Sequence, residues 1–134
     1  MILLDTDVIL DVALGREPHV DASARLLDQI ARGGRGAFVA WHTLANLYYL
    51  SRPARGDVGT RTFLLELTRF VTVAPTDSDA FRYAASLEMS DLEDAMQVAA
   101  ARACGVMTIA TRNVRDFRRA PIEVRTPAEL LGSS

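Results

Sequence analysis

Lysine is absent from this chain of 134 residues, because all fifteen of its basic residues are arginine. Enzymes that form a Schiff base through lysine, or that need the lysine of a P-loop, are therefore excluded. Cysteine occurs once, as Cys104, which excludes an intrachain disulfide and a cysteine-based zinc site and agrees with a reducing compartment. No apolar stretch approaches the roughly 20 residues of a membrane span, and the N-terminus lacks a basic-then-apolar signal pattern. We therefore expect a cytoplasmic protein with no membrane partner.

The composition indicates one compact domain. The chain is 49% hydrophobic and 24% charged, and it is long enough to bury a core, so we expect a single domain over residues 1–134. The net charge of −2 argues against broad, non-specific adhesion to nucleic acid but leaves room for a local basic patch. Five arginines between positions 112 and 125 are either phosphate donors beside a site or a solvated loop: Arg112, Arg115, Arg118, Arg119 and Arg125.

Short apolar runs alternate with helical patterns along the chain, which predicts βαβ units and a parallel sheet, and hence the α/β fold class. The expected strands are 1–4, 37–40, 70–74, 106–110 and 122–125. The expected helices are 7–14, 20–31, 43–51, one from Asp57 through Leu67, and 78–89, with a mobile loop at 53–59. Ser90 and Glu93 form a capping-box pattern that predicts one more helix, reaching Ala103.

Three aspartates occupy the ends of expected elements. Asp5 follows the first strand, Asp116 follows the strand at 106–110, and Asp94 lies in the first turn of the helix after Ser90. Ligand sites of open parallel sheets lie outside the carboxyl ends of the strands, where acids from distant parts of the sequence converge. At about 5 Å and an effective dielectric of about 20, each pair of carboxylates costs roughly 3 kcal/mol. A divalent cation such as Mg²⁺ or Mn²⁺ offsets this repulsion, so the sequence predicts a metal site.

Each acid also has a structural explanation. Asp94 could serve the helix dipole, although Glu93 already does so, and Asp116 could be an ordinary turn residue. For Asp5 this explanation is weaker, because an unpaired acid after a central strand is costly to bury. The three together favour a site. His42 has no metal-ligand spacing to another histidine, so we assign it no catalytic role.

Three segments of the chain resemble PIN-domain ribonucleases, in particular the VapC-type toxins of bacterial toxin-antitoxin pairs. They are Leu4-Asp5-Thr6-Asp7-Val8, the Asp-Leu-Glu-Asp-Ala-Met-Gln stretch around Asp94, and Thr111-Arg112-Asn113 with Asp116. The resemblance covers nearly the whole chain and implies a three-layer α/β/α sandwich with a central parallel sheet of about five strands. It also implies hydrolysis of RNA at a pocket that holds one or two Mg²⁺ or Mn²⁺ ions, a cognate antitoxin and a homodimer. By this resemblance the catalytic and metal-binding acids are Asp5, Asp94 and Asp116, with support from Thr6, Asp7, Asn46, Thr111, Arg112 and Asn113.

The chain departs from that family at two positions. Asn46 stands where a glutamate is usual, and Asp7 stands where an asparagine is usual. Asn46 can coordinate a metal only through its neutral carbonyl oxygen, which leaves a catalytically impaired, PIN-like binding protein as one alternative. A second alternative is a haloacid-dehalogenase-type phosphatase with Asp5 as nucleophile and Asp7 as general acid. That family also uses a lysine, which this chain lacks.

The third and fourth expected helices carry apolar residues around too much of their circumference for one buried stripe. We therefore expect an apolar surface covered by a second copy of the chain or by an antitoxin segment. The residues are Leu44, Leu47, Tyr48 and Leu50 in the third helix, and Val58, Phe63, Leu64 and Leu67 in the fourth.

Overall fold

The structure, a computed structural model, describes residues 1–132, so the last two residues of the expected domain, 133 and 134, lie outside it. A parallel five-stranded sheet in the order β3-β2-β1-β4-β5 forms its centre. Each strand lies within its expected range: β1 Ile2–Leu4, β2 Ala37–Val39, β3 Thr72–Val73, β4 Thr108–Ala110 and β5 Glu123–Arg125. Because β1 is the middle strand, the residue that follows it lies at the centre of the carboxyl edge of the sheet.

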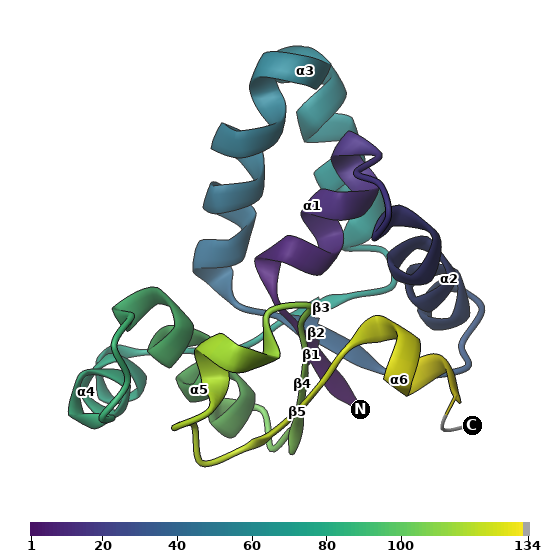
Figure 1. The fold of residues 1–134 in the computed structure, drawn as a ribbon. Helices are drawn as coiled ribbons and strands as arrows, with labels where there is room; N and C mark the ends of the chain where they lie inside the picture. Colours follow the sequence, from purple (N-terminus) through teal and green to yellow (C-terminus); the bar gives the residue numbers. More distant parts are fainter. Residues whose placement is uncertain (133–134) are drawn as a thin grey trace.

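Helices cover both faces of the sheet, as Figure 1 shows. One layer contains α1 Thr6–Leu14, α2 Val20–Ala31, α3 Trp41–Leu67 and α6 Pro127–Gly132, and the other contains α4 Ser78–Ser86 and α5 Leu92–Ala103. The alternation of side chains along β1 explains the division, because Ile2 and Leu4 pack with the first layer whereas Leu3 packs with α5. A short 3-10 helix, η1 Val114–Phe117, connects β4 to β5. The expected three-layer α/β/α fold is confirmed.

Helix α3 bears out two helical segments in this part of the chain but corrects the mobile loop expected at 53–59, because the one non-helical residue between the segments is Gly56. The helix continues through Pro53 and reverses at Gly56, so that it forms two arms joined at the top of Figure 1. Pro53 removes one backbone donor, but the carbonyl that loses its partner belongs to the exposed residue Tyr49, where water can satisfy it. Gly56 has φ 75° and ψ 170°, a conformation that only glycine adopts readily, and Thr60 donates its hydroxyl hydrogen to the Gly56 carbonyl at 2.7 Å.

The connection between α4 and α5 also differs from the sequence prediction. Helix α4 ends at Ser86, three residues before the expected end. The predicted capping box is wrong, because Asp91 rather than Ser90 caps α5 and its carboxylate accepts the Asp94 backbone N–H at 3.0 Å. Asp and Ser are equally good caps, and a cap one residue later leaves the Glu93 side chain free for other contacts.

The predicted apolar surplus on α3 is confirmed at Leu50 and Val58 but otherwise lies on residues that the pattern did not single out. Leu47 and Leu67 are buried in the core, and Leu44, Phe63 and Leu64 pack against it. The large apolar side chains that α3 leaves exposed are Trp41, Tyr49, Leu50, Val58 and Leu65. Within residues 1–132, no helix has both the length and the apolar character needed to cross a membrane.

Candidate functional site

Three carboxylates converge at the carboxyl edge of the sheet. Asp5 directly follows β1, and Glu93 and Asp94 belong to the first turn of α5. One ligand atom from each lies within 4.8 Å of the others. Asp5 is buried, whereas Glu93 and Asp94 are half-buried and face a more open side. The structure therefore brings together two of the predicted acids, Asp5 and Asp94, and adds Glu93, which sequence reasoning had explained by the helix dipole.

Asp5 is held in place by two hydrogen bonds from opposite directions. It caps α1, since the Thr6 backbone N–H donates to its Oδ1 at 2.8 Å, and the Thr111 hydroxyl donates to its Oδ2 at 2.9 Å. Burial, together with the charges of Asp7 and Glu93, raises the pKa of Asp5 to about 8, and the two hydrogen bonds oppose this only in part. A buried acid held this rigidly, with its negative charge poorly compensated, is what a cation site requires.

Glu93 is oriented by residues from α3 and α5. His42 Nε2 lies 2.6 Å from Glu93 Oε2, and Gln97 donates an amide hydrogen to the same oxygen at 3.0 Å. The Gln97 amide also donates to the Thr43 hydroxyl at 2.9 Å, and the Thr43 and Thr6 hydroxyls lie 3.1 Å apart. The only sequence signal for this network is Gln97, a polar residue in an alanine-rich helix four positions after Glu93. No spacing in the sequence relates His42 to Glu93.

Asp7 lies beside the end of β4. The Asn113 side-chain amide donates to Asp7 Oδ2 at 2.9 Å, and the Thr111 hydroxyl lies 3.2 Å from the same oxygen. Burial raises the pKa of Asp7, and the charge of Arg112 opposes that effect. Arg112 itself donates through Nε to the fully buried Asp11 at 2.8 Å. Asp7 is thus a member of the acidic edge, and Arg112 ties the end of β4 to α1 instead of pointing at solvent.

Asp116 lies on η1 at the border of the acidic cluster. It is exposed, and among the described residues it is not part of the three-carboxylate group within 4.8 Å. Burial and the charges of Asp91, Glu93 and Asp116, in that order, raise the pKa of Asp94 to about 7. The negative charge of Asp116 therefore acts on Asp94 from the open side of the cluster.

Asn46 is half-buried on the first arm of α3. It comes four positions after His42 and three after Thr43, and these spacings put it on the same helix face as those two residues. Within residues 1–132, the side chain of Asn46 forms no hydrogen bond. Its amide is therefore free to contact a ligand at this edge of the sheet.

The residues present fit a divalent cation. Three carboxylates provide the hard oxygen ligands that Mg²⁺ and Mn²⁺ prefer. Burial first, and then the charges of neighbouring carboxylates, raise the pKa values of Asp5 and Asp94, and a bound cation would offset both effects. Two more buried oxygens, Asp7 Oδ1 and Gln97 Oε1, have no hydrogen-bond partner in the part of the chain described. Unsatisfied buried oxygens around an acidic cluster are typical of a site that binds an ion or water.

Several solved structures share this fold over nearly the full chain. VapBC2 from Rickettsia felis, bound to a DNA fragment from its promoter, superposes with a TM-score of 0.73 at 16% identity, covering 94% of this chain and 98% of that one. A toxin-antitoxin complex from Klebsiella pneumoniae gives 0.70 at 20% identity, covering 95% and 98%. Mycobacterium tuberculosis VapC20, described as a sarcin-ricin-loop-cleaving toxin, gives 0.64 at 15% identity, covering 81% and 87%. At these identities the likeness shows a common fold.

The sequence provides independent evidence of family. No curated protein matches the chain. The sequence model of the PIN domain, however, matches residues 1–115, which include β1 with Asp5, the first turn of α5 with Glu93 and Asp94, and the end of β4. The chain therefore belongs to the PIN-domain family.

Proposed function

We propose that this protein is an Mg²⁺- or Mn²⁺-dependent endoribonuclease and the toxin of a toxin-antitoxin pair. The observation that carries the proposal is the convergence of Asp5, Glu93 and Asp94 within 4.8 Å at the carboxyl edge of the sheet. All-oxygen sites of this kind serve metal-assisted chemistry on phosphates. Membership of the PIN-domain family, and the likeness to a toxin described as cleaving the sarcin-ricin loop, support RNA as the substrate.

In this proposal Asp5, Glu93 and Asp94 hold the cation, and Asp116 approaches the same centre from η1. The cation would neutralise the three carboxylates, stabilise negative charge that develops on a phosphodiester and lower the pKa of an attacking water. The surrounding residues keep the ligands in position: Thr6 and Thr111 fix Asp5, and His42 and Gln97 fix Glu93. Thr111 and Asn113 hold Asp7 next to the cluster, where its carboxylate adds to the negative potential that attracts a cation.

The partner part of the proposal rests on the neighbouring structures and on α3. Among the structures that share the fold are toxin-antitoxin complexes, which supports a cognate antitoxin for this chain. The exposed apolar side chains of α3 offer a surface for such a partner, for a second copy of the chain or for both. We further propose that residues 1–134 form one domain and that the protein acts on RNA in the cytoplasm.

Cleavage of a labelled single-stranded RNA tests the enzymatic proposal. The wild type should cleave with Mn²⁺ or Mg²⁺ and stop cleaving when EDTA is added. Asp5→Asn and Glu93→Gln should reduce cleavage by at least about 100-fold, because each removes one charged ligand. Asp28→Asn is the matched control, since Asp28 is an exposed carboxylate on α2 that pairs with Arg32. Cleavage that persists in EDTA, or in Asp5→Asn, would contradict the proposal.

The same assay separates the two alternatives. A catalytically impaired binding protein, which Asn46 in place of the usual glutamate suggests, would bind RNA and metal without cleaving. A phosphatase would turn over a small phosphate ester and trap a phosphoryl group on Asp5. The structure gives Asp7 no exposed position from which to act as the general acid, because its carboxylate is held by Thr111 and Asn113.

A further inference from the structure

Three of the fifteen arginines differ from the rest. Within residues 1–132, the side chains of Arg115, Arg118 and Arg119 form no ion pair, hydrogen bond or ring contact. The other twelve arginines each have at least one such partner. In particular, Arg112 pairs with Asp11 and Arg125 pairs with Glu123. Of the five arginines that the sequence places between 112 and 125, three therefore have guanidinium groups available for a ligand.

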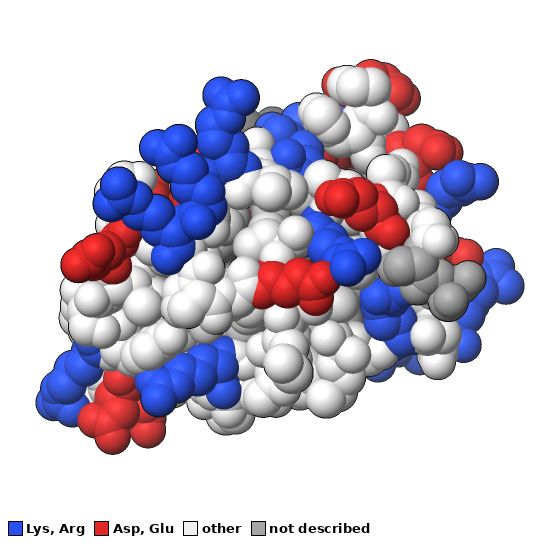
Figure 2. Space-filling view, turned by 60° about the horizontal axis from the view of Figure 1, so that its bottom comes forward, with Lys and Arg blue, Asp and Glu red and all other residues white. Residues whose placement is uncertain are grey.

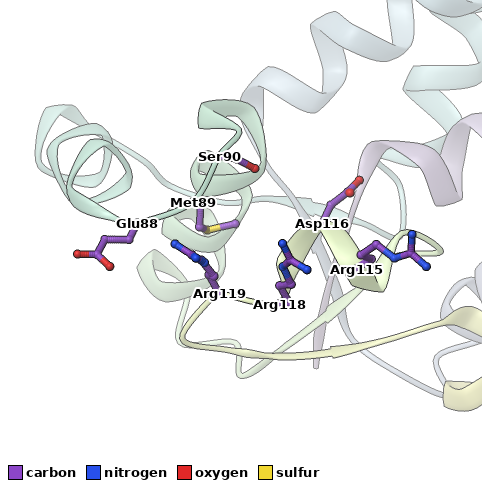
Figure 3. A pocket seen from close by; sticks show the side chains of 7 residues that line it. All are labelled: Glu88, Met89, Ser90, Arg115, Asp116, Arg118 and Arg119. Carbon is purple, nitrogen blue, oxygen red and sulfur yellow. The ribbon is translucent and has the colours of Figure 1, made fainter.

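These three arginines line a single pocket. The pocket has a volume of about 610 Å³ and lies between η1 and the loop that leads from α4 to α5. Its opposite wall consists of Glu88, Met89 and Ser90 (Figure 3). A volume of this size falls within the range of about 300–1,000 Å³ that small-molecule sites occupy. The basic side chains are also unevenly distributed, since Figure 2 shows arginines gathered in one area of the face that it presents.

The pocket adjoins the acidic cluster through Asp116. This residue lines the pocket together with Ser90, and Ser90 directly precedes Asp91, the cap of the helix α5 whose first turn carries Glu93 and Asp94. In the close view, Arg118 and Arg119 project on one side of Asp116 and Arg115 projects on the other, while the Glu88 carboxylate points away from all three (Figure 3). Phe117 is buried in the core and fixes η1, so the arginines on either side of it cannot fold inward.

We propose that this pocket binds the phosphate backbone of the RNA strand next to the bond that is cut, with Arg118 and Arg119 as phosphate ligands and Arg115 as a third contact. The inference rests on the proposed function, which it extends to the substrate-binding residues. Nucleic acid carries a phosphate at every nucleotide. A strand bound at the acidic cluster therefore brings the phosphates of its neighbouring nucleotides close to that cluster. Arginine is well suited to this task, because its planar guanidinium donates two hydrogen bonds to one phosphate.

The pocket favours a single strand over a duplex. The Met89 side chain gives the pocket an apolar surface against which an unstacked base can lie. The Ser90 hydroxyl can donate a hydrogen bond to a phosphate or a ribose. Proteins recognise single-stranded RNA by combining basic grooves with surfaces that accept splayed bases, whereas a continuous helix presents its bases inward. Because these arginines are exposed and unpaired, they can bind a phosphate without first breaking an existing ion pair.

Binding measured without metal tests this inference separately from catalysis. Fluorescence anisotropy of a labelled single-stranded RNA of mixed sequence, with the full chain in EDTA, gives the affinity and its salt dependence. We expect Arg118→Gln and Arg119→Gln each to weaken binding by about 3- to 10-fold. The triple variant with Arg115→Gln should reduce the slope of log affinity against log salt by about 2, since each phosphate contact on a single strand contributes about 0.7.

Two control variants sharpen the result. Arg32→Gln removes an exposed arginine of α2 that already pairs with Asp28, and it should leave RNA binding unchanged. Arg118→Lys keeps the charge but loses the planar fork, so its affinity should fall between those of the wild type and Arg118→Gln. The variants at Arg115, Arg118 and Arg119 should keep the melting temperature of the wild type, because these side chains have no partner to lose. Arg32→Gln should lower it by little, because an exposed ion pair contributes little to stability.

The outcomes distinguish this inference from the proposed function. RNA binding that depends on the three arginines, without any metal-dependent cleavage, would support the pocket and contradict the nuclease. Cleavage with an unchanged KM in the triple variant would support the nuclease and overturn the pocket. Equally strong, equally arginine-dependent binding of a polyglutamate peptide would assign the pocket to an acidic protein segment and overturn its assignment to RNA.

Discussion

The stability of the metal-free protein should fall as the pH rises, and Asp5 should be the main cause. Its pKa is raised from the ordinary value of 3.8 to about 8, so the folded state binds a proton that the unfolded state releases. For an acid whose pKa is raised by folding, the free energy of unfolding is highest below the pKa of the unfolded state. It then falls as the pH rises toward the pKa of the folded state. Between pH 5 and pH 8, three pH units at about 1.4 kcal/mol each correspond to a loss of about 4 kcal/mol.

Replacement of Asp5 by asparagine should remove the larger part of this pH dependence without disturbing the fold, and Asp94, whose pKa is raised to about 7, should account for the rest. Asparagine is an equally good helix cap, and its carbonyl oxygen can accept the Thr6 backbone N–H as Asp5 does. Its amide can donate to the Thr111 hydroxyl, which is then free to donate to Asp7. Thermal unfolding followed by circular dichroism in EDTA should show the wild type melting more than about 10 °C lower at pH 8 than at pH 5, and Asp5→Asn showing a much smaller difference.

Divalent metal should reverse the trend for the wild type. Mn²⁺ competes with the proton for the same carboxylates, so its stabilising effect should grow from pH 5 to pH 8 and should be largely absent in Asp5→Asn. Asp28→Asn, the surface control on α2, should behave as the wild type in every condition. Parallel pH profiles for the wild type and Asp5→Asn would refute the reasoning, because they would mean that Asp5 is not the group whose burial opposes ionisation.

Three further predictions follow from the geometry. Glu93→Gln should weaken Mn²⁺ binding by about 10- to 100-fold in calorimetric titration, and heats equal to those of the wild type would remove Glu93 from the set of ligands. Asn46→Glu should tighten metal binding without reducing RNA cleavage, because a fourth carboxylate is favourable beside a cation. Weaker metal binding would mean that the Asn46 amide donates an essential hydrogen bond. In light scattering, Tyr49→Asp combined with Leu65→Asp should convert a dimer into a monomer, whereas the control Phe81→Asp on α4 should not. A wild-type protein that is a monomer and co-purifies with no partner would count against the proposed surface on α3.

Local sequence was sufficient to predict most of the elements. The strands at β1, β2, β4 and β5 are short apolar runs, and each formed where the alternation of runs and helical patterns predicted it. Helix α2 begins and ends at the predicted residues, because its apolar face repeats at helical spacing and Gly33 and Gly34 follow its end. Where two local signals competed, the prediction was wrong: Ser90 and Asp91 are both good caps, and the pattern alone did not show which of them begins α5.

The candidate site was predictable in part for the same reason. Residues that follow a strand or begin a helix have positions set by their neighbours in the chain, and the rule for parallel sheets then brings Asp5 and Asp94 to one edge. Glu93 was missed because its role depends on His42, which is 51 positions away in the sequence and meets it only when α3 packs beside α5.

The sequence by itself determined the α/β class, the order of the elements and the arrival of Asp5 and Asp94 at the carboxyl edge of the sheet, since these depend on apolar periodicity and on residues adjacent in the chain. Tertiary structure decided the order of the strands, the reversal of α3 at Gly56, the role of Glu93 and the ion pairs between residues distant in the chain. The arginines between 112 and 125 illustrate the difference. In the sequence they form one basic run, but folding pairs Arg112 with Asp11 and Arg125 with Glu123 and leaves three arginines free at one pocket. Arg125 and Glu123 are two positions apart in one strand, whereas Arg112 and Asp11 are 101 positions apart, so their contact exists only after the sheet and its helices have packed.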